Sequence, residues 1–240
     1  MASKYLRGAL VQFIDTFPRP TPMVIIFQFN PETMTHSWQP AKAAEGAAGQ
    51  PAGPLAVAGS PEESFSFTLA MDANDMIAAG GAGGELAAAS GVYSRLAALE
   101  MLLFPTPAPD AALVNSGSAQ SNGASLNGAA ASKSPKPTKP VPAGVLPMVL
   151  FVWGPGRIVP VRVAQLTITE TLYDSDLLNP IHAEAQIQLN VLTQEELTLV
   201  KGPLGTIGRT SLAYSDKLRR NLAVDNLTNA VESVIGILPV

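Results

Sequence analysis

The side chains with the richest chemistry in this chain are two histidines, His36 and His182, and the chain contains no cysteine. Glu184 follows His182 by two residues, so both would lie on the outer face of a strand. A protein metal site commonly needs three or four His, Cys, Asp or Glu ligands. We therefore interpret both histidines as solvated or interface residues, and we predict no metal site and no thiol chemistry.

Scattered carboxylates are the remaining candidates for catalysis, because a pair of them can act as general acid and base in a hydrolase. They lie in turn-like regions whose spacing does not favour such a pair: Glu32, Glu62, Glu63, Asp72 and Asp75. No G-x-S-x-G elbow is present, and the glycine-rich run at 80–84 lacks the Lys-Ser/Thr of a phosphate-binding loop. We predict a protein that is not an enzyme and has no cofactor, and a hydrolase with scattered carboxylates is the alternative from another class.

The charge of the chain argues against nucleic acid as a partner. The formal net charge is −4, the sequence pI is about 5.2, and only 14% of the residues are charged, against about 25% in typical domains. So few charges indicate a protein surface that is weakly charged, or one that neighbouring proteins cover. The N-terminus does not resemble a signal peptide, and the longest apolar run, 145–153, is far shorter than the ~20 residues of a membrane span. We expect a chain that is cytoplasmic as synthesised and does not bind membranes directly.

Alternating apolar and polar residues predict a mainly β fold of the α+β type, an antiparallel sandwich or barrel of about seven strands. The final strand alternates most regularly, with Ala183, Ala185, Ile187, Leu189 and Val191 expected to point inward. Turns are expected at 154–156 and near Ala164. The expected strands are 9–14, 23–29, 64–71, 148–153, 157–163, 165–172 and 182–192.

Three segments predict helices. Residues 85–104 have one apolar stripe and end at Pro105, and Thr193-Gln-Glu-Glu196 forms a capping box that opens a short helix. Residues 211–238 form an amphipathic helix, whose apolar side is the candidate interface. The interface residues are Leu218, Leu222, Leu227, Val231, Val234 and Ile235.

Two segments rich in Ala, Gly, Ser and Pro interrupt this pattern, near 40–61 and 105–147. They contain too few apolar residues to offset the entropy of ordering them, so we expect disordered insertions. The chain then divides into a β domain at 1–200 that carries both insertions and a helical extension at 201–240.

Four motifs follow one another along the chain. Phe27-Gln-Phe-Asn-Pro-Glu32 is an aromatic strand end, Ser64-Phe-Ser-Phe-Thr-Leu69 leads to Asp72, Phe151-Val-Trp-Gly154 ends an apolar strand, and a strand pair spans 165–192. In this order they resemble the tube-like baseplate proteins of contractile injection systems. These phage-tail-like particles include the antifeeding-prophage and Photorhabdus virulence cassette types. The resemblance covers roughly 5–39, 60–104 and 145–200.

The resemblance implies a tube-protein-like β-sandwich with one packed helix and structural rather than catalytic roles for the motif residues. Those residues are Phe27, Phe29, Asn30, Pro31, Phe151, Trp153 and Gly154. It further implies an inner-baseplate component that joins the inner tube to the spike, within a symmetric multi-copy assembly of baseplate, tube and spike subunits, in a particle that stays in the cell or is released. A tube-initiating or tube-layer protein of the same machine is the alternative. Many such proteins continue into a C-terminal lysin-motif domain, where this chain has the 211–238 helix instead.

Overall fold

Seven strands form one antiparallel sheet in the computed structural model, which describes residues 6–14, 21–44, 53–105 and 146–235. The mainly β prediction is therefore confirmed. Side chains of Ile14, Thr21 and 227–235 are not part of this description. In sheet order the strands are β2 (Thr21–Ile26), β1 (Ala9–Ile14), β7 (Met148–Val152), β8 (Ile158–Tyr173), β9 (Pro180–Val191), β6 (Glu62–Asp72) and β3 (Met34–Gln39).

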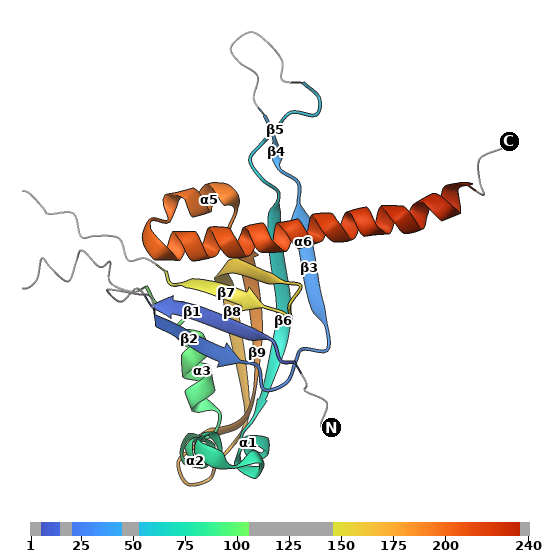
Figure 1. Ribbon diagram of the computed structural model, residues 1–240. Coiled ribbons are helices and arrows are strands. Elements are labelled where there is room, and N and C mark those ends of the chain that lie inside the picture. Colours follow the sequence, from blue (N-terminus) through green and yellow to red (C-terminus); the bar gives the residue numbers. More distant parts are fainter. Residues whose placement is uncertain (1–5, 15–20, 45–52, 106–145, 236–240) are drawn as a thin grey trace, which may run out of the picture.

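The sheet curls until its two ends face each other (Figure 1). Three strand spacings separate β7 from β6 in sheet order, which would be about 14 Å in a flat sheet. The ring of Phe151 on β7 nevertheless lies 5.2 Å from that of Phe65 and 5.4 Å from that of Phe67, both on β6. We call β2, β1 and β7 the front layer and β9, β6 and β3 the back layer.

Strand β8 belongs to both layers. Its first residues pair with β7, from Ile158 opposite Val152 to Val161 opposite Val149, and from Val161 to Tyr173 it pairs with β9. A β-bulge between Val163 and Gln165 allows the strand to bend. The prediction of two strands with a turn near Ala164 is therefore wrong, because one strand of 16 residues continues through the bulge.

The core lies between the two layers and is rich in aromatic residues. Phe27 packs against Phe67 at a centroid distance of 5.6 Å and against Trp153 at 6.4 Å. Gly8 lies directly beneath these rings, where a Cβ atom would come within 2.7 Å of both Phe27 and Trp153. The inward residues predicted for β9 are all buried, which confirms the alternation there.

Two short helices, α2 (Gly81–Ser90) and α3 (Tyr93–Glu100), overlap the one helix predicted at 85–104, and a further helix, α1 (Ala73–Ala79), precedes them and was not predicted. Gly91 separates α2 from α3 with a φ of 58°, a conformation that favours glycine. The apolar stripe predicted for residues 85–104 consists of Val92, Leu96, Leu99 and Leu103. It is correct in part, because the first three residues are buried and Leu103 is exposed.

The C-terminal part of the chain contains α5 (Gln194–Leu199) and α6 (Gly202–Ile235). The predicted capping box is confirmed, because the Thr193 hydroxyl accepts from Glu196 N while Glu196 accepts from Thr193 N. Helix α6 begins nine residues before the predicted Ser211, and residues 236–240 lie outside the described residues.

Further differences concern the first third of the chain. Strand β2 ends at Ile26 rather than at Phe29, and β3 was not predicted because five of its six residues are exposed and show no alternation. Flanks of the predicted insertion at 40–61 form a small ladder of β4 (Lys42–Ala43) and β5 (Val57–Ala58), which projects from the body (Figure 1). Residues 45–52 and 106–145, the centres of the two predicted insertions, lie outside the described residues.

Candidate interaction surfaces

Helix α6 consists of an anchored half, 202–219, and a projecting half, 220–235, and Figure 1 shows the helix continuing past β3 beyond the body. Buried positions occur only in the anchored half, at Gly205, Gly208, Leu212 and Ser215, among the side chains that the structure describes. A helix of 34 residues is about 51 Å long. The projecting half is therefore an arm of about 24 Å.

Close contact fixes the anchored half on the sheet. A Cβ atom at Gly208 would lie 2.8 Å from the Leu197 side chain and 3.1 Å from the Met148 sulfur, so a larger residue there would require these side chains to shift. The Ser215 hydroxyl also accepts from Ile158 N at 3.1 Å and donates to Ile158 O at 2.8 Å. Both backbone groups at the start of β8 are thus satisfied by one helix side chain.

A buried carboxylate marks the point where α6 leaves the body. Glu63 on β6 is 5% exposed. It accepts from Arg219 of α6 at 3.1 Å and contacts His36 Nε2 at 2.7 Å. The Arg219 guanidinium lies over the Trp38 ring, 4.6 Å from its centroid, and also pairs with Asp216 at 3.2 Å. A buried charge needs such partners, so this cluster ties α6 to β3 and β6.

Beyond Arg219 every described side chain of α6, from Arg220 to Asn226, is exposed. Leu222 is 59% exposed and Val224 is 64% exposed. An isolated helix of this length is marginal in water, and its stability here comes from the anchored half that it continues.

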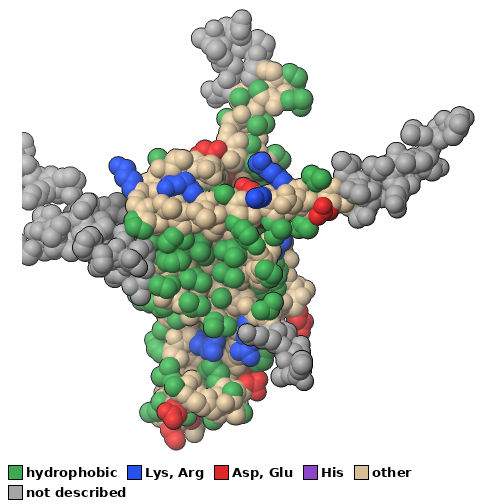
Figure 2. Space-filling model, in the orientation of Figure 1, with side chains coloured by type: hydrophobic (Ala, Val, Ile, Leu, Met, Phe, Trp, Pro, Cys, Tyr) green, Lys and Arg blue, Asp and Glu red, His purple; other side chains and the backbone are tan. Residues whose placement is uncertain are grey.

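The second surface is the outward side of the front layer, which we call the front face. Strand register places every second residue of β2, β1, β7 and the start of β8 there. Each of these residues is apolar: Ala9, Val11, Phe13, Pro22, Val24, Ile26, Met148, Leu150, Val152, Ile158 and Pro160. Val24 and Ile26 are each 52% exposed, while Ala9, Met148, Leu150 and Pro160 are buried. Figure 2 shows the hydrophobic side chains gathered below α6. Apolar residues on both sides of a strand are typical of sheets that are covered on both faces.

The residues that carry the family resemblance lie near one another at the aromatic end of the core. Phe27 and Phe151 are buried there and Trp153 is half-buried. Gly154 has a φ of 67° in the turn after β7. Phe29 is 41% exposed, which corrects the expectation that its ring faces the core as part of a strand.

Asn30 connects two segments that are far apart in the sequence. Its Oδ1 accepts from Gly8 N and its Nδ2 donates to Leu6 O, each at 2.9 Å. The neighbouring Gln28 pairs both of its amide groups with the backbone of Asp72 in the same way, at 2.9 and 3.1 Å. The turn containing Pro31 is thus held to β1 and β6 by two side-chain amides, a structural role.

The predicted interface residues of α6 fall into three groups. Leu218 is half-buried in the anchored half, and Leu222 is exposed in the projecting half. Leu227, Val231, Val234 and Ile235 lie in the helix, and their side chains are outside the described residues. The sequence prediction missed Arg219, Trp38 and Glu63, because nothing in their spacing indicates that they meet.

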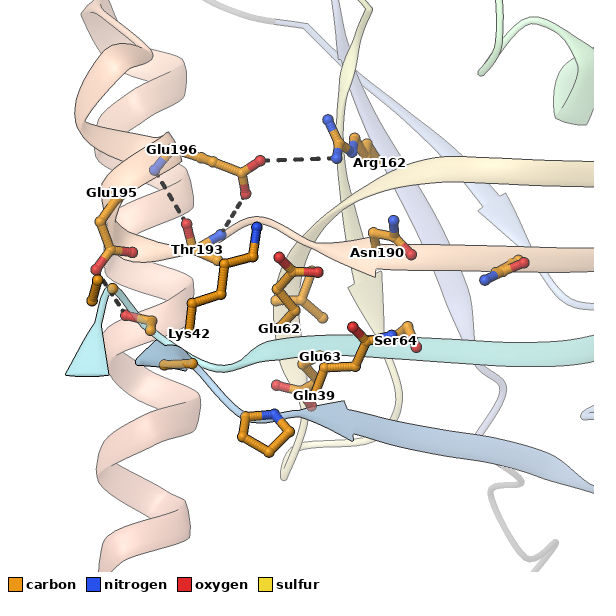
Figure 3. Close-up of a pocket in the computed structure, with 17 residues that line it drawn as sticks. Gln39, Lys42, Glu62, Glu63, Ser64, Arg162, Asn190, Thr193, Glu195 and Glu196 are labelled. Carbon is orange, nitrogen blue, oxygen red and sulfur yellow. Dashed lines mark hydrogen bonds and ion pairs between the residues drawn. The ribbon is translucent and has the colours of Figure 1, made fainter. Parts of the chain in front are cut away.

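An open groove of about 570 Å³ lies between the base of the β4–β5 ladder, β6, β9 and α5 (Figure 3). Two of its charged residues pair with each other, because Arg162 lies 3.9 Å from Glu196, and the Ser60 hydroxyl donates to Glu195 at 3.0 Å. Hydrogen bonds from its own backbone and from Ser60 lower the pKa of Glu195. In this groove a hydroxyl engages the Glu195 carboxylate and an arginine engages that of Glu196.

The other carboxylates considered for catalysis are dispersed. Asp72 caps α1 by accepting from Asn74 N and Asp75 N, and it lies 3.5 Å from His182. Glu32 and Glu184 are exposed, and Glu184 points outward from β9. Within the described ranges no three His, Asp or Glu side chains come together in a way that could hold a metal ion.

Among the helices of the described residues, none has the length and apolar character required to cross a membrane. Comparison of the chain with protein-family models and with curated proteins finds no match to either.

Proposed function

We propose that this protein is a structural subunit of a contractile injection system, an inner-baseplate component that joins the inner tube to the spike. The observation that carries the proposal is the front face, an uncharged apolar sheet surface next to a projecting helix. Large exposed apolar patches mark sites of protein association. A subunit enclosed by neighbours on several sides would need both features.

The resemblance to tube-like baseplate proteins supplies the choice of machine. Three of its motif residues, Phe27, Phe151 and Trp153, pack together in one aromatic cluster, as structural signatures of a tube-like β-sandwich would. The curled antiparallel sheet is compatible with that fold. No specific observation favours the tube-layer alternative, so the baseplate role is the one we propose.

A non-enzymatic role is part of this proposal. Three of the carboxylates have structural partners: Asp72 caps α1, Glu63 pairs with Arg219 and His36, and Glu196 lies 3.9 Å from Arg162. Such pairs hold elements together: Arg219 and Glu63 join α6 to the sheet. In an assembly that moves, this ion pair would keep the arm at a fixed angle to the body.

The test uses the tagged full chain expressed in its own host, with contractile particles isolated by sedimentation and imaged by electron microscopy. We expect the tag in the particle fraction at the baseplate end, and particles without a complete baseplate when the gene is deleted. A tag along the whole tube would indicate a tube-layer protein instead. Particles that assemble normally without the chain would refute both roles.

A truncation gives a matched comparison. Ending the chain after Arg220 removes the projecting half and keeps Arg219, Ser215 and the other anchoring contacts, so we expect a folded protein that is not incorporated. Removing residues from Ser211 onward would also remove Leu212, which is 8% exposed, and Ser215, and is expected to damage the fold. If the chain that ends after Arg220 entered particles normally, the arm would not be needed for incorporation.

A further inference from the structure

The front face requires an occupant that is itself apolar. Its described residues carry no charge and no hydrogen-bonding side chain. Val24 and Ile26 on the edge strand β2 are half exposed, while Ala9, Met148, Leu150 and Pro160 are buried, so the most accessible part of the face is the part that β2 carries. Leaving apolar surface exposed to water costs a free energy of about 25 cal/mol per Å². A polar or charged partner would lose its hydration there without gaining a counter-charge.

The structure already contains one helix on this face. Met148 and Pro160 belong to the front face, and a Cβ atom at Gly208 of α6 would lie within 3.1 Å of Met148 and 3.7 Å of Pro160. The anchored half of α6 thus covers the edge of the face, and the uncovered part continues beside it (Figure 2). A second helix would extend the same layer.

The projecting half of α6 has the properties of that second helix. Val224 is 64% exposed, and spacings of three, four and three relate it to Leu227, Val231 and Val234. These positions share one side of a helix. At about 100° per residue, they lie roughly a third of a turn from the positions that face the body, such as Leu212 and Ser215.

The arm cannot cover the front face of its own chain. Helix α6 runs without a break from Gly202 to Ile235 and leaves the body past β3, on the side away from β2 (Figure 1). Two complementary apolar surfaces on opposite sides of one molecule can meet only between copies. Such a contact is head-to-tail, and repeated contacts of this kind close into rings or continue as filaments.

We propose that the projecting half of α6 in one copy docks on the front face of a second copy. The arm lies beside the anchored half of the second copy's α6 and covers Val24 and Ile26. This inference rests on the multi-copy assembly in the proposed function, and it names the surfaces that the copies use.

The experiment mixes two variants of the full chain, each lacking one surface. Val224→Glu places a charge on the arm, and Val24→Glu places one on the front face. Both sites are more than half exposed, so each variant should fold. We expect the wild-type chain to form concentration-dependent oligomers in sedimentation velocity. Each variant alone should be monomeric under the same conditions. The association constant of each variant should fall at least about tenfold, which corresponds to ~1.4 kcal/mol.

The mixture separates head-to-tail docking from the alternatives. One intact arm and one intact front face remain between the two variants, so we expect a complex of one copy of each. Arm-to-arm pairing would instead let Val24→Glu assemble alone, and face-to-face pairing would let Val224→Glu assemble alone. Either result overturns the inference, as does a wild-type chain that stays monomeric at all concentrations tested.

Matched controls carry the same charge at polar exposed positions. Asn226→Glu lies on the arm and Thr169→Glu on β8, and both should assemble like the wild type. If Val24→Glu unfolds in circular dichroism, Val24→Thr is the replacement. A wild-type chain that is monomeric in solution yet enters the particle refutes only this inference, whereas absence from the particle refutes the proposed function whatever the solution state.

Discussion

The front layer carries apolar side chains on both of its sides, whereas the back layer carries them only toward the core. On β9 of the back layer, buried Ala185, Ile187 and Leu189 alternate with exposed Gln186 and Gln188. On β7 of the front layer, inward Val149 and Phe151 alternate with outward Met148, Leu150 and Val152, which are also apolar, and of these only Val152 is partly exposed. Gln12 is the polar exception on the inner side of the front layer.

This difference distinguishes what folding requires from what association requires. The inward residues of both layers build one core, so both are expected to matter for stability. Outward polar residues keep the back layer hydrated, while the outward apolar residues of the front layer gain nothing from water. The asymmetry indicates which side of the molecule is built for contact with another protein.

Phe151→Ala should have the largest effect, because this front-layer ring is fully buried and contacts the back layer through Phe65 and Phe67. We expect a loss of about 3–5 kcal/mol in the free energy of unfolding, measured by denaturant titration. Gln186→Ala, on the exposed side of the back layer, should change it little. If Phe151→Ala lowered the free energy of unfolding no more than Gln186→Ala does, the ring of Phe151 would not be part of a core shared by the two layers.

Arg219→Ala should cost less than the loss of a buried aromatic ring. The substitution leaves the Glu63 carboxylate buried with His36 as its remaining neighbour, and a hydrogen bond to a charged group contributes about 1.5–3 kcal/mol. Because Arg219 is itself half exposed, we expect a loss near the lower end, about 1.5 kcal/mol. The exposed neighbour Arg220 serves as the control, and if Arg220→Ala had the same cost the cluster would have no special role.

Phe29→Ala and Phe27→Ala compare two aromatic residues from the same motif. Phe27 is 2% exposed and Phe29 is 41% exposed. We expect about 3–5 kcal/mol for the buried ring and about 1 kcal/mol or less for the exposed one, again from denaturant titration. A large cost at Phe29 would show that it is covered in solution.

Polar replacements on the front face should alter stability least. Val24→Thr combined with Ile26→Thr is expected to change the free energy of unfolding by less than about 1 kcal/mol, while fluorescence of a dye that binds apolar surfaces should fall. The reverse change on the back layer, Gln186→Val with Gln188→Val, should raise that fluorescence. Unchanged dye binding in both variants would contradict the contrast between the layers.

Much of the fold could be predicted from alternation, and its errors have physical causes. The β8 bulge shifts the inward positions from Val161 and Val163 to Leu166 and Ile168, and this change of phase resembles a turn in the sequence. Strand β3 was missed because an exposed edge strand has no buried side to impose alternation. Its register is set by pairing with β6, which the sequence does not reveal.

The interaction surfaces were predictable only in part. The apolar runs at 23–27 and 148–152 contain both phases of the alternation, which is the signal of a strand covered on two sides. The Glu63 cluster joins residues 156 positions apart in the chain, and only the curl of the sheet brings them together. The division of α6 at Arg219 follows from where the sheet ends, since helical periodicity is the same on both sides of that point.

Because β8 pairs with both β7 and β9, the two layers cannot separate without breaking backbone hydrogen bonds along a shared strand. Ser215 attaches α6 to the start of this same strand. Arg219 attaches the same helix to Glu63 of β6, so a pull on the arm would reach the front layer through β8 and the back layer through β6. These two attachments oppose rotation of the anchored half of α6 on the sheet.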